Sequence, residues 1–156
     1  MSKKSPFKNQ DKRVEYDNII YLINTEENTA GVISLKGKDR HIIIPCSINH
    51  ESKEYYVTSI FENAFNGSKI ESVQFAPDSR LQTIEKNAFS HSTIKNIKIP
   101  SSVTSIGENA FSWCIQLEVI EIPDDSKLQT IDENAFFNSR IKSIKIPSEL
   151  IDLKEG

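Results

Sequence analysis

Hydrophobic positions recur at a nearly regular interval from residue 57 onward. Each repeat opens on an apolar residue, has an Ile three places later and closes on Asn-Ala-Phe. The blocks VTSIFENAF, LQTIEKNAF, VTSIGENAF and LQTIDENAF begin at Val57, Leu81, Val103 and Leu128, and a partial repeat begins at Leu150. Successive starts are therefore 24, 22, 25 and 22 residues apart. Repeats of this length are typical of a solenoid, in which each unit buries its apolar edge against its neighbours.

A second hydrophobic block in each repeat predicts a short strand. Apolar residues, mainly Ile and Val, occupy its first, fourth and sixth places, as in a strand with one buried face. A proline then ends the strand, because proline cannot donate to the sheet ladder. We expect the Asn-Ala-Phe segments to form short helical turns whose phenylalanines stack inside the molecule. The strand blocks start at Ile70, Ile94, Leu117 and Ile141, the prolines are Pro77, Pro100, Pro123 and Pro147, and the phenylalanines are Phe65, Phe89, Phe111 and Phe136.

These patterns predict a leucine-rich-repeat solenoid with short parallel strands, one per repeat, with short helical turns and a β-rich N-terminal cap. The cap spans residues 14–56, where segments 19–23, 32–35 and 42–44 have the composition of strands. Pro45 follows the last of them as the other prolines follow the repeat strands, so we expect 42–44 to be the first rung of the sheet. The repeats occupy residues 57–156. Residues 1–13 are polar and basic, and we expect a disordered tail.

Composition narrows the class of partner. The chain has 156 residues, of which 26% are charged and 37% hydrophobic, and a net charge of −3. This mild charge gives no reason to expect nucleic acid or an anionic membrane as a partner. No apolar run approaches the roughly 20 residues that cross a bilayer, so membrane insertion is not expected. The two cysteines, Cys46 and Cys114, lie in segments about two repeats apart, and we expect them to be free thiols.

The repeat motif resembles that of the BspA-like branch of leucine-rich-repeat proteins. The shared pattern is I-x-x-x-A-F, a small residue or Cys, and then L-x-x-I-x-I-P, and the match covers residues 57–153. Cys114 keeps the cysteine that the family often has, whereas the other repeats have Ser68, Ser92 and Ser139. The resemblance implies an adhesin or surface antigen that binds a host or cell-surface protein. It also implies a secreted or cell-surface location, although the chain shows neither a signal peptide nor a transmembrane segment.

Outward-facing strand positions form the first candidate binding surface. In a parallel stack they become columns in which charge alternates from rung to rung. Exposed ion pairs contribute little and are weakened by salt, so the columns could serve only to keep the repeats in register. Alternatively they form a docking surface, since repeat proteins bind through extended faces. One column is Gln74, Lys98, Glu121 and Lys145, another is Glu71, Lys95, Glu118 and Lys142, and Ser72, Asn96, Val119 and Ser143 lie between them.

An aromatic pair is the second candidate. Trp113 occupies the place of Gly67, His91 and Asn138 in the other repeats, and Phe137 occupies the place of Asn66, Ser90 and Ser112. If adjacent repeats bring the two rings together, they form an exposed aromatic patch, and exposed Trp is enriched at binding hot spots. Single exposed aromatic residues are nevertheless ordinary on protein surfaces.

The sequence gives little support for a catalytic site or a cofactor site. His41, Cys46 and His50 are close in sequence, but zinc prefers four ligands with paired Cys spacing. A nucleophilic cysteine would need an oriented base, and no glycine-rich phosphate loop is present. We expect no catalytic residue, no metal and no cofactor. The tripeptide Asn66-Gly67-Ser68 could accept a glycan if the chain were exported.

Two functions of different classes remain. The first is an adhesin-like or surface-antigen-like module, without enzymatic activity, that recognises a protein through the solenoid surface. The alternative is a scaffold or regulatory adaptor in the cytoplasm, which the mild charge and free cysteines favour. Self-association through the open C-terminal end of the solenoid is a further option, because an unpaired sheet edge can join a second molecule.

Overall fold

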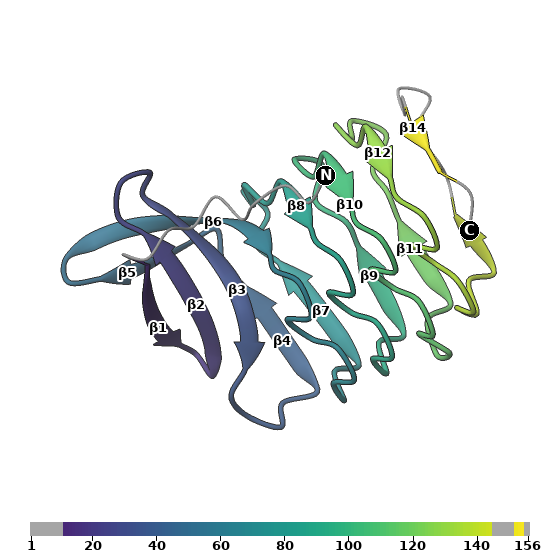
Figure 1. Ribbon diagram of the computed structural model, residues 1–156, viewed down its shortest axis with the longest axis horizontal. Helices are drawn as coiled ribbons and strands as arrows, with labels where there is room; N and C mark the ends of the chain where they lie inside the picture. Colours follow the sequence, from purple (N-terminus) through teal and green to yellow (C-terminus); the bar gives the residue numbers. More distant parts are fainter. Residues whose placement is uncertain (1–10, 145–151, 155–156) are drawn as a thin grey trace.

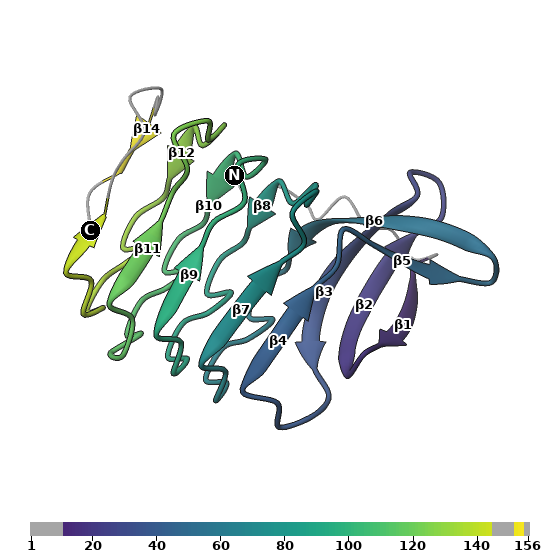
Figure 2. The ribbon, with the colours of Figure 1, turned by 180° about the vertical axis from the view of Figure 1, so that it is seen from behind.

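The computed structural model, which describes residues 11–144 and 152–154, is a short solenoid built from two β-sheets (Figures 1 and 2). In the nine-stranded sheet the order is β1-β2-β3-β6-β8-β10-β12-β14, and β5 pairs with β6 beside this path. In the five-stranded sheet the order is β13-β11-β9-β7-β4. The strands of the larger sheet are β1 (Lys12–Tyr16), β2 (Ile19–Asn24), β3 (Thr29–Leu35), β5 (Ser47–His50), β6 (Lys53–Ile60), β8 (Thr83–Ile84), β10 (Ser105–Ile106), β12 (Thr130–Ile131) and β14 (Asp152–Leu153), and those of the smaller sheet are β4 (His41–Ile44), β7 (Ser72–Phe75), β9 (Asn96–Lys98), β11 (Val119–Glu121) and β13 (Ser143–Ile144).

Each repeat contributes one strand to each sheet. The predicted strand blocks become β7, β9, β11 and β13, which pair in parallel, and their central residues Val73, Ile97 and Ile120 are buried. The opening blocks add a second strand of two residues, in which Ile84, Ile106 and Ile131 point into the same core. The predicted parallel solenoid is confirmed, and the structure adds this second short strand to the one strand per repeat that the sequence predicted.

The Asn-Ala-Phe segments form turns in which every second backbone N–H donates to the next repeat, and the others donate three residues back in the same segment. Phe65 N donates to Ala88 O at 2.8 Å, Phe89 N to Ala110 O at 2.8 Å and Phe111 N to Ala135 O at 2.7 Å. A helix would need these N–H groups to donate four residues back along the same segment. No helix occurs in the described part of the chain, so the predicted short helical turns are not confirmed.

The four phenylalanines of these turns form a continuous stack inside the solenoid. Ring centroids are 5.1 Å apart for Phe65–Phe89, 5.1 Å for Phe89–Phe111 and 5.6 Å for Phe111–Phe136. The first three rings are fully buried, and Phe136 at the end of the stack is partly buried. The predicted internal stack is therefore confirmed.

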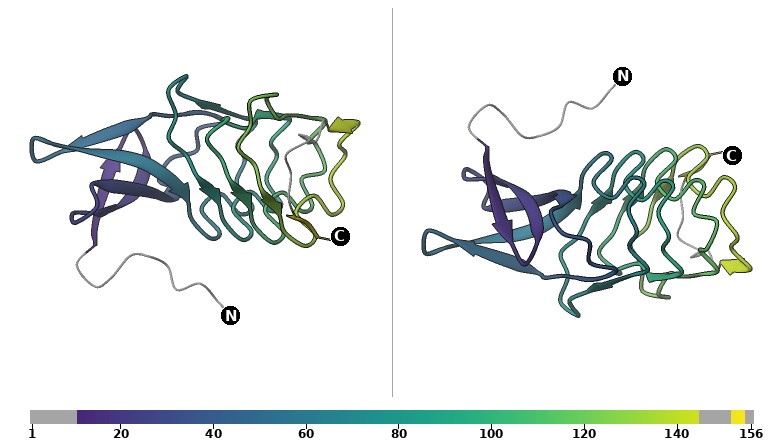
Figure 3. Two further views of the ribbon diagram at one scale, coloured as in Figure 1. Left: turned by 90° about the horizontal axis from the view of Figure 1, so that it is seen from above. Right: turned by 90° about the horizontal axis from the view of Figure 1, so that it is seen from below.

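The N-terminal segment extends the larger sheet with antiparallel strands and starts the smaller one. β1, β2 and β3 pair antiparallel, and β3 then pairs in parallel with β6. The β5–β6 hairpin projects from this end of the molecule (Figure 3). β4 pairs in parallel with β7, which makes it the first rung of the five-stranded sheet, as Pro45 had suggested. β1 begins at Lys12.

Candidate functional site

The outer face of the five-stranded sheet brings the predicted columns together. Register aligns Ser72 with Asn96, Asn96 with Val119 and Val119 with Ser143, so these four residues form one row across the rungs. Lys98 is aligned with Glu121 in the next row, where Gln74 is also exposed. β4 extends both rows, because His41 aligns with Ser72 and Ile43 with Gln74. Lys145 lies outside the described residues.

Charges in the columns are largely matched within the molecule. Lys98 and Glu121 form an ion pair at 2.8 Å, and so do Lys142 and Glu118 at 2.9 Å. Pairs of this kind align adjacent rungs and leave few free charges on the face. The ion pairs fit the interpretation that the columns keep the repeats in register, and recognition by this face would then depend on the uncharged row between them.

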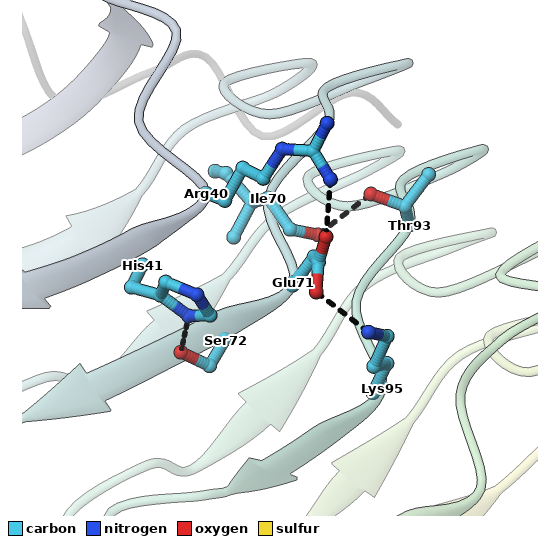
Figure 4. A network of polar contacts seen from close by, with 7 residues as sticks. All are labelled: Arg40, His41, Ile70, Glu71, Ser72, Thr93 and Lys95. Carbon is cyan, nitrogen blue, oxygen red and sulfur yellow. Dashed lines mark hydrogen bonds and ion pairs between the residues drawn. The ribbon is translucent and has the colours of Figure 1, made fainter.

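Glu71 is the most strongly held carboxylate on this face (Figure 4). Lys95 and Arg40 each donate to it at 2.6 Å, and the two hydrogen bonds, that from Lys95 first, lower the pKa of Glu71 to about 2. His41 Nδ1 lies 2.8 Å from Ser72 Oγ beside it. Sequence reasoning missed the role of Arg40. Its signal was its place just before the first rung, one rung away from Glu71.

The predicted aromatic patch is present and is larger than expected. His91 and Trp113 stack with centroids 5.8 Å apart and an interplanar angle of 5°, and Phe137 meets Trp113 edge-on at 6.2 Å. We call His91, Trp113 and Phe137 the aromatic ridge. Trp113 and Phe137 are each 46% exposed, although aromatic side chains usually contribute most when buried. His91 was missed, yet it occupies the same repeat position as Trp113.

Trp113 has an unusual backbone conformation for a bulky residue. Its φ is 58°, and the equivalent residues Gly67, His91 and Asn138 have φ values of 67°, 57° and 53°. Gly and Asn tolerate this left-handed region, whereas for a large side chain it is strained and rare. The repeat position thus requires a left-handed residue, and Trp is a poor choice for stability alone.

Ile115 enlarges the apolar surface next to the ridge. This repeat is longer than its neighbours, and between Cys114 and Leu117 it has two residues where the preceding repeat has only Thr93. Ile115 is 57% exposed. Of the six exposed large hydrophobic residues in the described chain, four lie in residues 113–137: Trp113, Ile115, Val119 and Phe137.

Cys114 beneath the ridge has a packing role. Its Sγ donates to Phe89 O at 3.0 Å and lies 3.5 Å from Ser92 Oγ. Burial raises the pKa of the Cys114 thiol, which disfavours the nucleophilic thiolate. Cys46 is also free and only partly buried, and desolvation raises its pKa as well.

The three residues that could have suggested metal chemistry are on separate elements. His41 begins β4, Cys46 lies between β4 and β5, and His50 ends β5 beside Glu51, whose Oε1 is 3.4 Å from His50 Nε2. Across the residues that the structure describes, no three His, Cys, Asp or Glu side chains gather as a metal site, and no helix could span a membrane. Asn66 of the possible glycan acceptor is exposed and donates to Asn63 Oδ1 at 3.2 Å.

A shallow groove runs along the proline turns at the end of the five-stranded sheet. Its volume is about 490 Å³, and its lining includes Gln74, Lys98, Pro77, Pro100 and Pro123. Two candidate residues thus border a concave surface. The three prolines, one from each of three successive repeats, contribute conformationally restricted apolar surface to its lining.

These features define a leucine-rich-repeat solenoid with a polar strand face and an aromatic ridge. A family model described as "BspA type Leucine rich repeat region (6 copies)" matches residues 44–156. The chain therefore belongs to the BspA-type leucine-rich-repeat family. A search of curated proteins finds no match.

Solved structures with the same fold come from several bacteria. The pneumococcal vaccine antigen PcpA is 24% identical with a TM-score of 0.70, and the match covers 91% of this chain and 46% of that one. A leucine-rich-repeat protein from Bacteroides capillosus is 24% identical with a TM-score of 0.55, over 91% of this chain and 87% of that one. The leucine-rich-repeat protein of T. pallidum is 22% identical with a TM-score of 0.51, over 89% and 52%. The chain thus spans about half the length of the pneumococcal antigen, and these likenesses establish the fold.

Proposed function

We propose that this protein is an adhesin-like or surface-antigen-like module that binds a protein partner and has no enzymatic activity. The partner would contact the aromatic ridge, Ile115 and the neighbouring uncharged row of the five-stranded sheet. One observation carries the proposal: an exposed Trp occupies a left-handed position where the other repeats have Gly, His and Asn. A residue that is poor for stability and exposed to solvent is best explained by binding.

The chemistry of the ridge favours a protein over a sugar. Carbohydrate stacking needs a free aromatic face, but His91 covers one face of Trp113 and Phe137 contacts the ring edge-on. The ridge therefore leaves at most one face of Trp113 open, and it adds the exposed aliphatic side chain of Ile115. Such a surface suits apolar side chains of a protein, packed around a central Trp.

Variants that copy residues from other repeats test the proposal. Trp113→Asn installs the residue found at position 138, and Val119→Ser installs the residue found at positions 72 and 143. Gln129→Thr, at an exposed position directly before β12, copies Thr104 and is the matched control. A photo-crosslinking amino acid at Ile115 would capture the partner from a preparation of cell-surface proteins, and the same group at Gln129 would serve as its control.

Affinity for the captured partner then decides the outcome. We expect Trp113→Asn to weaken binding about tenfold or more, because a central Trp in an interface is a typical hot spot. Val119→Ser should weaken it less, and Gln129→Thr should leave it unchanged. Equal affinities of wild type and Trp113→Asn, with both proteins folded, would refute the ridge as the binding surface.

The cellular location separates this function from the alternative of a cytoplasmic adaptor. The family membership and the likeness to a bacterial antigen favour the surface. Protease treatment of intact source cells should cleave a surface module. A chain that stays intact until the cells are lysed would support the adaptor, which would bind its partner through the same ridge.

A further inference from the structure

β4 is the terminal strand of the five-stranded sheet, and its second edge has no strand beside it in the described chain. It pairs with β7, and no other pairing of β4 occurs in residues 11–144 or 152–154. Figure 1 places β4 where the repeat stack meets the N-terminal strands. An unpaired edge presents backbone donors and acceptors that can bind another extended chain.

The register shows which backbone groups of β4 face outward. Ser72 N donates to Arg40 O at 3.1 Å, and Ala76 N donates to Ile44 O at 3.1 Å. Because parallel strands alternate the direction of these groups, Ile42 also faces β7, whereas the N–H and C=O groups of His41 and Ile43 point away from it. Within the described residues, no backbone or side-chain group bonds to these four groups. Within the described chain these four groups are therefore open to a hydrogen-bonding partner.

Side chains on β4 do not protect this edge, in contrast to those on β1, the terminal strand of the nine-stranded sheet. β1 carries exposed Lys12, Arg13 and Glu15, and such charges are a common protection against unwanted pairing. On β4 the exposed residues are His41, which contacts Ser72, and Ile43, which is 59% exposed. An uncharged edge with an exposed Ile is suited to strand addition.

We propose that the β4 edge binds an extended segment of a partner protein, which adds a sixth strand to the five-stranded sheet. This rests on the proposed protein-binding function and assigns a second contact, separate from the aromatic ridge. The N–H and C=O groups of His41 and Ile43 would make four main-chain hydrogen bonds, and an apolar residue of the segment would cover Ile43. Lys38 precedes β4, is exposed and has no ion-pair partner among the described residues. It favours a segment that carries a carboxylate beside the N-terminal end of β4.

The chain supplies its own probe for this edge. A synthetic peptide KIESVQFAP, copied from residues 69–77, contains the β7 sequence that already pairs with β4 on the other side. Titrated at up to millimolar concentration into the ¹⁵N-labelled protein, it should shift the amide signals of His41 and Ile43 and slow their hydrogen exchange. The amides of Asn96 and Val119 in the interior of the sheet should change little.

Two substitutions at one position separate the edge from the side chain. Ile43→Pro removes an outward N–H that the β4–β7 ladder does not use, so the variant should fold. It should bind the peptide at least tenfold more weakly, whereas Ile43→Val should bind it like wild type. If Ile43→Pro does not fold, Ile43→Lys gives the same test, because an edge charge opposes pairing.

The result is independent of the ridge. Trp113→Asn should bind the peptide normally. Partner binding by Trp113→Asn therefore tests the aromatic ridge, and peptide binding by Ile43→Pro tests the β4 edge, so that either proposal can fail without the other. Absence of peptide binding to wild type, or equal binding by folded Ile43→Pro, would overturn the proposal. The proposal would also be overturned if the free protein were a dimer in which the His41 and Ile43 amides are already protected from hydrogen exchange, since the occupant would then be a second copy.

Discussion

At the scale of single residues, left-handed backbone positions explain much of the repeat sequence. Asn63, Asn87, Asn109 and Asn134 have φ values of 61°, 55°, 56° and 56°, and Asn adopts this region more easily than other residues with a Cβ. The Asn of the Asn-Ala-Phe motif is therefore a conformational requirement. Trp113 fills a similar position without that tolerance, which is why its presence points to a contact with another molecule.

Ionised Glu71 stabilises the folded protein, and this stabilisation is lost at acid pH. Its pKa is lowered from 4.5 to about 2, so its contribution is present above the unfolded value and is lost as the pH falls from about 5 toward 2. Glu71→Gln removes the ion pairs with Lys95 and Arg40. We expect the variant to be less stable than wild type at pH 7 and the difference to shrink by pH 2.5, measured as free energies of urea unfolding.

Glu85 is a control, because the pH dependence that it gives to stability is opposite to that of Glu71. Burial raises its pKa, so the protonated form is favoured in the folded protein and stability is lost as the pH rises through that pKa. Glu85→Gln should be at least as stable as wild type at pH 7. A constant difference between Glu71→Gln and wild type across this pH range would contradict the role assigned to the Glu71 ion pairs.

At the scale of elements, the turns depend on one residue each. Asn109→Ala places a Cβ residue without local hydrogen-bonding capacity at φ 56°, which should cost about 1–2 kcal/mol of unfolding free energy. Asn109→Gly should stay within a few tenths of a kcal/mol of wild type, because Gly adopts this region freely. Urea unfolding followed by circular dichroism measures both. Similar losses for Ala and Gly would show that the side-chain bond from Asn109 to Glu108, and not the backbone angle, stabilises the turn.

The same elements show how far sequence patterns extend. The strand blocks and the phenylalanine stack could be predicted, because Ile, Val and Phe recur at the same positions in each repeat. The second strand could not, since a two-residue Thr-Ile or Ser-Ile segment is too short to show alternation. The helical turns failed because the N–H groups of each turn alternate between a carbonyl three residues back and a carbonyl of the next repeat, and the bonds between repeats leave no local signature.

The candidate surfaces were predictable only in part. Repeat alignment placed Trp113 next to Phe137 and set out the charged columns. It did not reveal the stack with His91 or the ion pair from Arg40 to Glu71, because both depend on which side chains the rungs bring within a few ångströms. The exposure of Ile115 follows from one inserted residue, whose direction no periodic pattern determines.

At the scale of the whole molecule, stability passes from one repeat to the next. Each turn bonds to the turn of the following repeat, and the phenylalanine stack crosses every one of these contacts. In such a linear array the free energy of unfolding is close to a sum of repeat and nearest-neighbour contributions. A substitution inside the stack therefore weakens two contacts, and one at its end weakens a single contact.

Phe111 and Phe136 provide the matched comparison. Phe111 is fully buried between Phe89 and Phe136, so Phe111→Ala opens a cavity and should lower the free energy of unfolding by about 3–5 kcal/mol. Phe136 is only partly buried and has one stacked neighbour among the described rings, so Phe136→Ala should cost clearly less. Urea unfolding of both variants tests this order. If the two losses were equal, the stack would not be the continuous interior on which the surface positions of the aromatic ridge and the strand face depend, and both would have to be reassigned.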